Sequence, residues 1–185
     1  VGEEKEYAAL KYVLYTLLGS VFMLVGFALL SLNYHDVKQV YSFDLLDLLT
    51  VPVPVGQQIL IFWLIFMGLA FKAPIFPFHT WLPDALVQGP IGMSVILAGI
   101  KLGTYGFLRF SFPLLPEASK DETVVTIVMV LGLVAIVYGA VIAMIQADFR
   151  RLLVFSSISH LGFVVIGLFA MNFQGIQGSL LQICL

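Results

Sequence analysis

Charged residues are scarce in this sequence. Only 11% of its 185 residues are Asp, Glu, Lys or Arg, and the formal net charge is −2. Soluble domains typically carry about 25% charged residues. A net charge this small also gives no basic surface for a nucleic acid or for acidic lipids. The shortage of charge therefore argues against a soluble domain and against a nucleic-acid partner.

Cysteine is almost absent as well. Cys184 is the only one, so an internal disulfide and a cysteine-ligated metal cluster are excluded. We interpret this thiol as a small apolar filler. The sequence has no nucleotide-binding glycine loop, hydrolytic triad or redox-ligand set, and its histidines (His35, His79 and His160) are scattered. We therefore predict no redox cofactor and no metal in this chain.

A start typical of a secreted protein is missing too. The sequence begins Val-Gly-Glu-Glu-Lys-Glu, without a methionine, a basic region and an apolar core, so no signal peptide is predicted. Its last residue, Leu185, lies inside an apolar run. We interpret residues 1–185 as an internal piece of a longer membrane protein.

What the sequence has in abundance is apolar side chains. Hydrophobic residues make up 61% of it, and its mean hydropathy is +1.04. A small soluble core could not cover so much apolar surface, so lipid is the expected solvent. A spanning helix needs about 20 apolar residues. Five stretches qualify, and a further one begins near Gly175: Tyr12–Leu32, Ile59–Phe78, Gly89–Leu108, Thr123–Ala147 and Leu152–Phe173. These stretches predict an all-α, polytopic membrane helix bundle.

The connections between these stretches add to the prediction. Residues Phe43–Leu49 are apolar but interrupted by aspartates, which is typical of an interfacial helix. The link Asp148–Arg151 is very short, so the two helices that it joins should be antiparallel neighbours. Lysine and arginine counts favour placing this link on the cytoplasmic or stromal-type side.

Three ionisable residues interrupt the apolar stretches. They are Lys72, Lys101 and His160. A lysine at the centre of a spanning helix costs roughly 2.5–3.5 kcal/mol on insertion, so such residues usually face a bundle interior or a wet cavity. At ~1.5 Å per residue, Lys72 and Lys101 lie roughly 16–18 Å from the end that their helices share, and His160 lies roughly 14 Å from the same face. Three groups at similar depth predict a lateral proton relay. For the two lysines, the alternative is structural pairing with a carboxylate outside this piece. For His160, the alternative is a hydrogen-bonded histidine that serves only packing.

Two prolines interrupt the second stretch just after its lysine. Pro74 and Pro77 each remove a helical hydrogen bond, and non-helical backbone at this depth is tolerated only beside protein or a wet cavity. Broken helices of this kind mark ion sites in transporters, although a simple kink is the alternative. Candidate gating or water-path residues near the break and before the relay histidine are His79, Asp84, Ser156 and Ser159.

Three segments together resemble a known family. The first reads Phe71-Lys72-Ala-Pro-Ile-Phe-Pro-Phe-His79-Thr-Trp-Leu-Pro-Asp-Ala85. The second runs from Ser94 through Lys101 to Phe110, and the third from Gln146 through His160 to Phe163. They are similar to the broken helix, the following helix and the histidine-bearing helix of the antiporter-like membrane subunits of respiratory complex I. Leu108–Ser119 resembles most the M-type (chain 4) branch of NAD(P)H-quinone oxidoreductase.

The resemblance carries expectations about fold and function. It implies that residues 1–185 are a partial proton-translocating membrane domain. This domain would be one half of an inverted-repeat antiporter-like fold, in which Lys72, Lys101 and His160 form the proton relay. It implies a translocase subunit of an NAD(P)H- or ferredoxin-quinone oxidoreductase, with quinone, NAD(P)H or ferredoxin and iron–sulfur clusters in other subunits. Its partners would be antiporter-like and quinone-module neighbours in the membrane arm, together with the lipid bilayer. A bacterial inner membrane or a cyanobacterial thylakoid membrane is the implied location.

Other functions fit the same residues. A subunit of a multi-subunit cation/proton antiporter shares these motifs and would work without a quinone reductase. A structural membrane scaffold would tolerate methionine at Lys72 and Lys101. Membrane hydrogenase or formate-lyase assemblies form a further alternative, which a metal-carrying partner would reveal.

Overall fold

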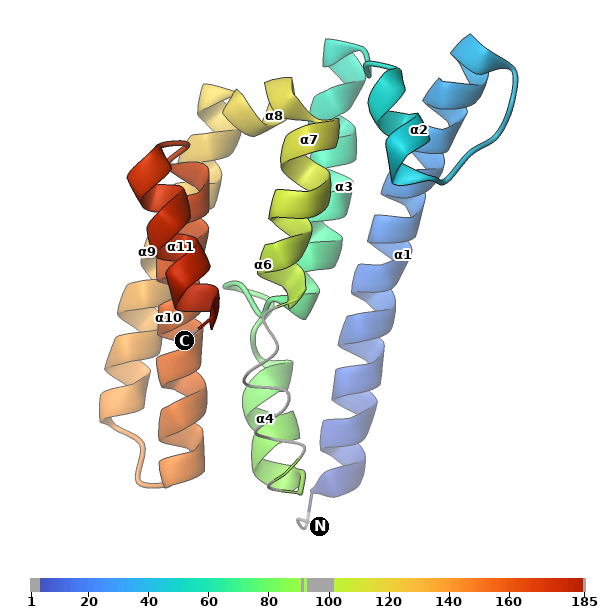
Figure 1. Cartoon of the computed structure of the whole chain (residues 1–185). Helices are drawn as coiled ribbons and strands as arrows, with labels where there is room; N and C mark the ends of the chain where they lie inside the picture. Colours follow the sequence, from blue (N-terminus) through green and yellow to red (C-terminus); the bar gives the residue numbers. More distant parts are fainter. Residues whose placement is uncertain (1–3, 91, 93–101, 185) are drawn as a thin grey trace.

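The computed structural model describes residues 4–90, 92 and 102–184. Within these ranges the chain forms helices and no strands (Figure 1). Among the described residues, four helices are long and apolar enough to cross a membrane: α1 (Lys5–Lys38), α3 (Val55–Lys72), α9 (Glu122–Met144) and α10 (Phe149–Phe169). The prediction of an all-helical, polytopic membrane fold is confirmed.

The first helix is longer than the stretch expected at Tyr12–Leu32. α1 has 34 residues and is therefore about 51 Å long, whereas the hydrocarbon core of a bilayer is about 30 Å thick. Its extra turns carry exposed polar residues, among them Lys5 and Glu6 at one end and Lys38 at the other. Hydropathy excludes such residues from a predicted span, although a helix can continue through them into water.

A short helix follows where an interfacial helix was expected at Phe43–Leu49. α2 (Leu45–Thr50) lies beside the far end of α1 (Figure 1). Asp44 caps it, because its carboxylate accepts a hydrogen bond of 2.9 Å from the amide of Leu46.

The stretch expected at Ile59–Phe78 is interrupted. α3 begins earlier, at Val55, and ends at Lys72, and the chain becomes helical again in α4 (Trp81–Gln88). The helix therefore stops before the two prolines rather than after them, since Pro74 cannot continue its hydrogen-bond pattern.

The stretch expected at Gly89–Leu108 falls partly on residues 93–101, which lie outside the described residues. Its last part is helical and continues beyond Leu108. It comprises α6 (Leu102–Gly106), the π-helix η1 (Phe107–Ser111) and α7 (Phe112–Leu114), and α8 (Pro116–Lys120) then crosses to α9.

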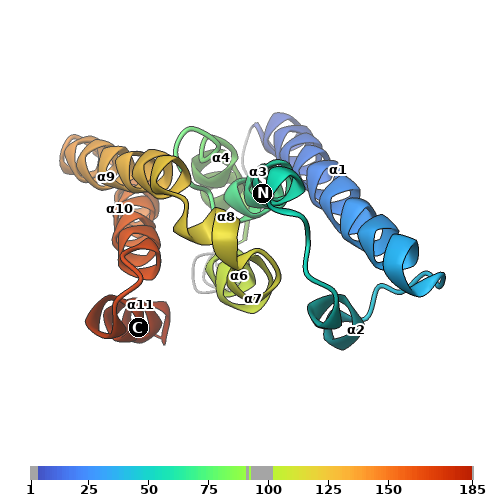
Figure 2. The same ribbon diagram turned by 90° about the horizontal axis from the view of Figure 1, so that it is seen from above.

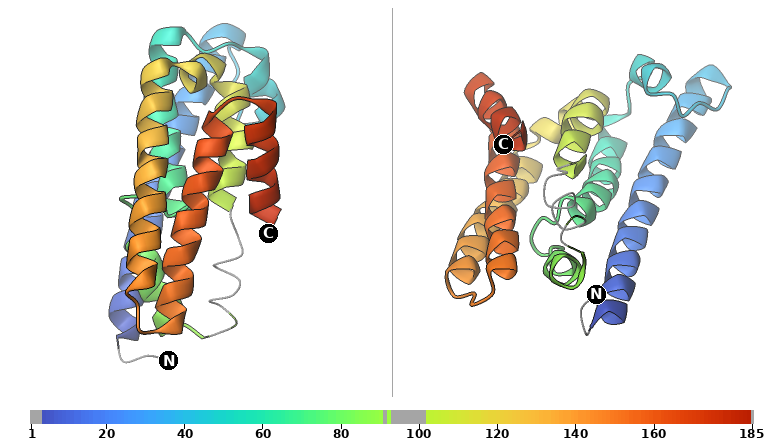
Figure 3. Two further views of the ribbon diagram at one scale, coloured as in Figure 1. Left: turned by 90° about the vertical axis from the view of Figure 1, so that its left-hand side faces the viewer. Right: turned by 60° about the horizontal axis from the view of Figure 1, so that its bottom comes forward.

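The last helices lie side by side (Figure 3). α9 ends before the expected Ala147, α10 begins before the expected Leu152 and ends at Phe169, and α11 spans Phe173–Cys184. Asp121 and Asp148 cap α9 and α10 through backbone amides of the first turn. A capping aspartate at each start explains why the helices begin where they do.

Close packing holds the long helices together in pairs. A methyl group at Gly19 would lie 2.6 Å from the Phe71 side chain, and one at Gly139 would lie 2.8 Å from the backbone nitrogen of Ser159. Small residues of this kind let membrane helices approach closely. Seen from above, α1 lies on one side, α9, α10 and α11 lie on the other, and the broken helix lies between them (Figure 2).

Candidate functional site

The backbone leaves the helical path at Lys72 and turns before α4 begins. The amide of Ala73 donates to the carbonyl of Leu69 at 2.7 Å, and the amide of Ile75 donates to the carbonyl of Ala70 at 3.0 Å. The first bond joins residues four apart, as in an α-helix, whereas the second joins residues five apart, so the turn widens at Ile75. The predicted proline-broken helix is confirmed.

A tryptophan side chain spans the break. The indole nitrogen of Trp81, in the first turn of α4, donates a hydrogen bond of 2.9 Å to the carbonyl oxygen of Phe71 near the end of α3. The indole is buried, at 4% exposure. Burying a carbonyl without a partner is costly, so this contact stabilises the interrupted helix. Sequence reasoning did not assign Trp81 a role.

His79 lies in the break and is buried, at 3% exposure. Its ring centroid lies 5.5 Å from that of Phe76 and 5.0 Å from that of Tyr138 on α9. Within the described part of the chain, its Nδ1 atom is buried and has no hydrogen-bond partner. The break thus encloses a polar imidazole among aromatic rings, and Tyr138 is a neighbour that no sequence pattern indicated.

The residues expected to relay protons lie on different elements. Lys72 is the last residue of α3, and His160 lies on α10; both side chains are exposed on this chain taken by itself. Lys101 lies outside the described residues. The structure therefore places two of the three on the surface of this chain and gives no arrangement for the third.

The serines before His160 contribute to helix packing. The hydroxyl of Ser159 donates a hydrogen bond of 3.0 Å to the carbonyl oxygen of Ile136 on α9. That of Ser157 donates to the carbonyl of Leu153 in its own helix, at 2.9 Å. Ser156 is half-buried on the same helix. The Ser159 hydroxyl, which was expected to line a water path, thus joins α9 to α10.

Asp84 on α4 forms an ion pair with Lys11 on α1. The Nζ atom of Lys11 lies 2.6 Å from the Oδ2 atom of Asp84. Sequence reasoning named Asp84 but not its partner, because 73 residues separate the two.

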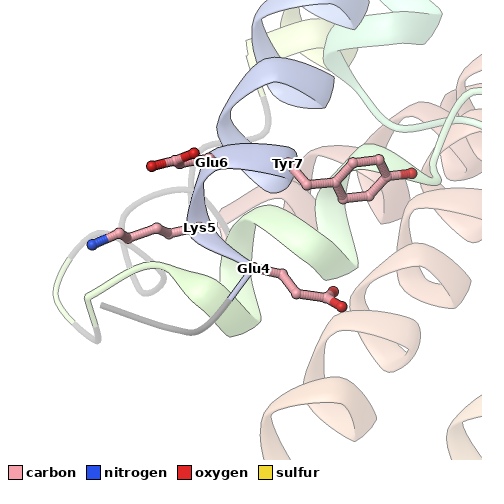
Figure 4. Close-up of a pocket in the computed structure, with 4 residues that line it drawn as sticks. All are labelled: Glu4, Lys5, Glu6 and Tyr7. Carbon is pink, nitrogen blue, oxygen red and sulfur yellow. The ribbon is translucent and has the colours of Figure 1, made fainter.

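A hollow of about 580 Å³ lies at the start of α1, lined by Glu4, Lys5, Glu6 and Tyr7. Lys5 and Glu6 project on one side of the helix, and Tyr7 projects on the other, as Figure 4 shows. Across the described residues, no group of three or more His, Cys, Asp or Glu side chains could hold a metal ion.

The fold and the break define a class of protein: a polytopic helical membrane protein in which a lysine precedes a proline-interrupted helix. The chain belongs to the family described as "NADH:quinone oxidoreductase/Mrp antiporter, TM", whose profile matches residues 2–185. Membership in this family confirms the resemblance seen in the sequence.

Relatives and solved structures agree with this assignment. The chain is 46% identical over 185 residues to "NADH-quinone oxidoreductase subunit M" of Rickettsia typhi, covering 98% of this chain but 36% of the relative. The chain thus spans about a third of the length of the curated relatives it matches. A chain of respiratory complex I from Thermus thermophilus with bound NADH has a TM-score of 0.86 at 31% identity, covering 98% of this chain and 38% of that one. A chain of the Mrp complex from Dietzia sp. DQ12-45-1b has a TM-score of 0.80 at 26% identity, covering 100% and 20%.

Proposed function

We propose that this chain forms part of a proton-translocating membrane subunit of an NADH-quinone oxidoreductase. The observation that carries the proposal is the broken helix, in which Lys72 comes directly before a non-helical segment. Similarity to subunit M of Rickettsia typhi, over 98% of this chain, supports the same function. Redox chemistry would take place in other subunits, with quinone, NAD(P)H or ferredoxin and iron–sulfur clusters, and no redox centre would lie in this chain.

In this proposal, water delivers a proton to Lys72 through the break, and His160 and Lys101 pass it along the membrane midplane. An amine can take up and release a proton as neighbouring charges change, and imidazole titrates near neutral pH. Lys72 and His160 are exposed on this chain. The proposal requires that the rest of a longer protein covers them, because hydrocarbon disfavours a charged side chain.

The polar residues around the break would guide water. His79 is buried at the break, and Asp84, Ser156 and Ser159 lie on the helices packed beside it. α4 packs against α10 through apolar side chains that include Leu82, Leu86 and Ile158. The broken helix is therefore adjacent to the helix that carries His160, as a short proton path requires. Other membrane-arm subunits and the lipid bilayer would be the partners.

A cation/proton antiporter subunit is the second candidate. It is favoured by the likeness to the Mrp complex from Dietzia sp. DQ12-45-1b, at a TM-score of 0.80. The two candidates differ in their energy source. Sodium-dependent transport without a quinone reductase would select the antiporter.

The test is Lys72→Ala in the intact complex in membrane vesicles, with Lys5→Ala, at an exposed position of α1, as the matched control. We expect the Lys72 variant to assemble but to lose proton pumping driven by quinone reduction, since the relay lacks its first amine. The control should pump normally. An unchanged proton-to-electron stoichiometry in the Lys72 variant would overturn the proposal.

A further inference from the structure

The half-helix α4 is too short to hold its own position. It has 8 residues, whereas a helix needs about 20 residues to cross the hydrocarbon core and be fixed at both membrane surfaces. The turn at residues 73–80 joins it to α3. Its position, and with it the position of His79 and Trp81, must therefore be set by the helices packed against it.

One face of α1 supplies two polar contacts to this segment. Lys11 pairs with Asp84 at 2.6 Å. One turn further along α1, the hydroxyl groups of Tyr15 and Thr80 are hydrogen-bonded at 2.9 Å. Residues four apart lie on the same face of a helix, so both contacts anchor α4 to a single stripe of α1.

An aromatic contact lies between these two polar contacts. The ring of Tyr12 lies 5.2 Å from that of Trp81, which is the side chain that reaches back to the carbonyl of Phe71. The stripe on α1 thus contacts the same tryptophan that spans the break. A displacement at Lys11 would reach the break through Trp81.

The ion pair is partly shielded from solvent. The side chains of Lys11 and Asp84 are 20% and 31% exposed, and the Tyr7 ring, which lines the hollow in Figure 4, lies 5.7 Å from the Lys11 Nζ atom. On the far side of α4, Arg150 donates a weaker hydrogen bond of 3.4 Å to the carbonyl of Val87. Removing one partner of a shielded ion pair leaves the other charge uncompensated, which is costly.

We propose that the Lys11–Asp84 ion pair is a positioning device that holds α4, and thereby His79 and Trp81, in place for proton transfer through the break. The inference rests on the proposed function. It assigns Asp84 the role of a fixed anion that orients the half-helix, in place of a carboxylate that carries protons. The essential property is then the presence of opposite charges at the two positions, whichever residue bears each charge.

A charge-exchange experiment in the complete complex tests this assignment. The variants are Lys11→Met, Asp84→Asn, both together, and the exchanged pair Lys11→Asp with Asp84→Lys. Pumping per assembled complex, driven by quinone reduction, is measured in membrane vesicles. Lys5→Met and Glu6→Gln, at exposed positions of the same helix, are the matched controls.

We expect each single variant to pump roughly threefold to tenfold less, and the exchanged pair to recover most of the loss. The inference requires only opposite charges at the two positions, so failure of the exchanged pair to exceed the single variants overturns it. Normal pumping in both single variants overturns it too.

If the neutral variants assemble poorly, two variants that keep both charges test the ion pair instead. Lys11→Arg and Asp84→Glu keep opposite charges at nearly the same separation and should pump to within about twofold of the parent. A larger loss in either, with normal assembly, counts against the ion pair. If the parent complex pumps and Lys72→Ala abolishes pumping, the proposed function stands whichever way the charge exchange turns out. A parent complex that does not pump would instead refute the proposed function.

Discussion

The indole nitrogen of Trp81 and the carbonyl oxygen of Phe71 are joined by a hydrogen bond of 2.9 Å across the interruption between α3 and α4. The two residues are ten positions apart, too far for a helical hydrogen bond. A side chain of α4 thus supplies the donor that the backbone cannot. The contact links the end of one half-helix to the first turn of the other.

Trp81→Phe should destabilise this arrangement. The phenyl ring keeps much of the apolar volume but leaves the Phe71 carbonyl buried without its donor, which costs about 1–3 kcal/mol. The thermal stability of the purified protein in detergent measures the loss. Trp63→Phe is the matched control, because Trp63 lies half-buried on α3 and packs edge-on against Phe66, at 5.3 Å. Equal stability of the two variants would contradict the role assigned to Trp81.

His79→Phe should separate packing from proton transfer. Phe76 and Tyr138 already surround the ring, so a phenyl group fits and the complex should assemble. Pumping should fall by roughly tenfold or more, because the polar atoms in the break are lost. His35→Phe makes the same substitution where the ring stacks on Tyr41, at 4.1 Å, and should leave pumping unchanged. Full pumping in the His79 variant would remove this residue from the water path.

Gly139→Ala should separate α9 from α10. The added methyl group would lie 2.8 Å from the nitrogen of Ser159 and 2.9 Å from the oxygen of Phe155. Both are backbone atoms, which cannot rotate away, so the helices must shift, at a cost of about 1–3 kcal/mol. Thermal unfolding in detergent reports the change. Gly178→Ala, where a methyl group would meet nothing within 4 Å, should unfold at or slightly above the parent temperature, because alanine favours a helix more than glycine does. A similar decrease in both variants would argue against close packing.

Gln58→Leu should loosen the end of the molecule opposite α4. The buried Gln58 amide donates to the carbonyl of Val53 at 2.9 Å and accepts from the backbone amides of Glu117 and Ala118, both at 3.2 Å. Leucine satisfies none of these groups, and each one left buried and unpaired costs about 1–3 kcal/mol. Proteolysis within residues 115–121 should therefore become faster. Gln57→Leu, at the exposed neighbour, should not change it.

Much of the fold could be predicted from the sequence because membrane spans follow from local composition. The apolar stretches indicated the long helices, and Pro74 and Pro77 indicated the break. The helix ends were less predictable. α1 continues through polar residues such as Lys5 and Lys38, which hydropathy treats as boundaries, whereas α3 stops at Lys72 as soon as the proline pattern begins.

The contacts around the break could not be predicted in the same way. Asp84 and Lys11 lie far apart in the chain, and no local pattern pairs an aspartate after a proline with one particular lysine of another helix. One ring neighbour of His79, Tyr138, likewise comes from another helix, α9. Such pairs depend on how the helices pack, which one sequence does not specify. The relay assignment of Lys72, Lys101 and His160 remains a prediction.

The continuous helix α1 contacts both α3 and α4. It therefore holds the two halves of the broken helix in one alignment, because neither half can rotate about the break without losing its contacts with α1. Glycine contacts at Gly19 and Gly26 hold the α3 half, and Lys11 and Tyr15 hold the α4 half. In the proposed function, proton transfer at the break would therefore depend on side chains such as His79 rather than on movement of the two half-helices.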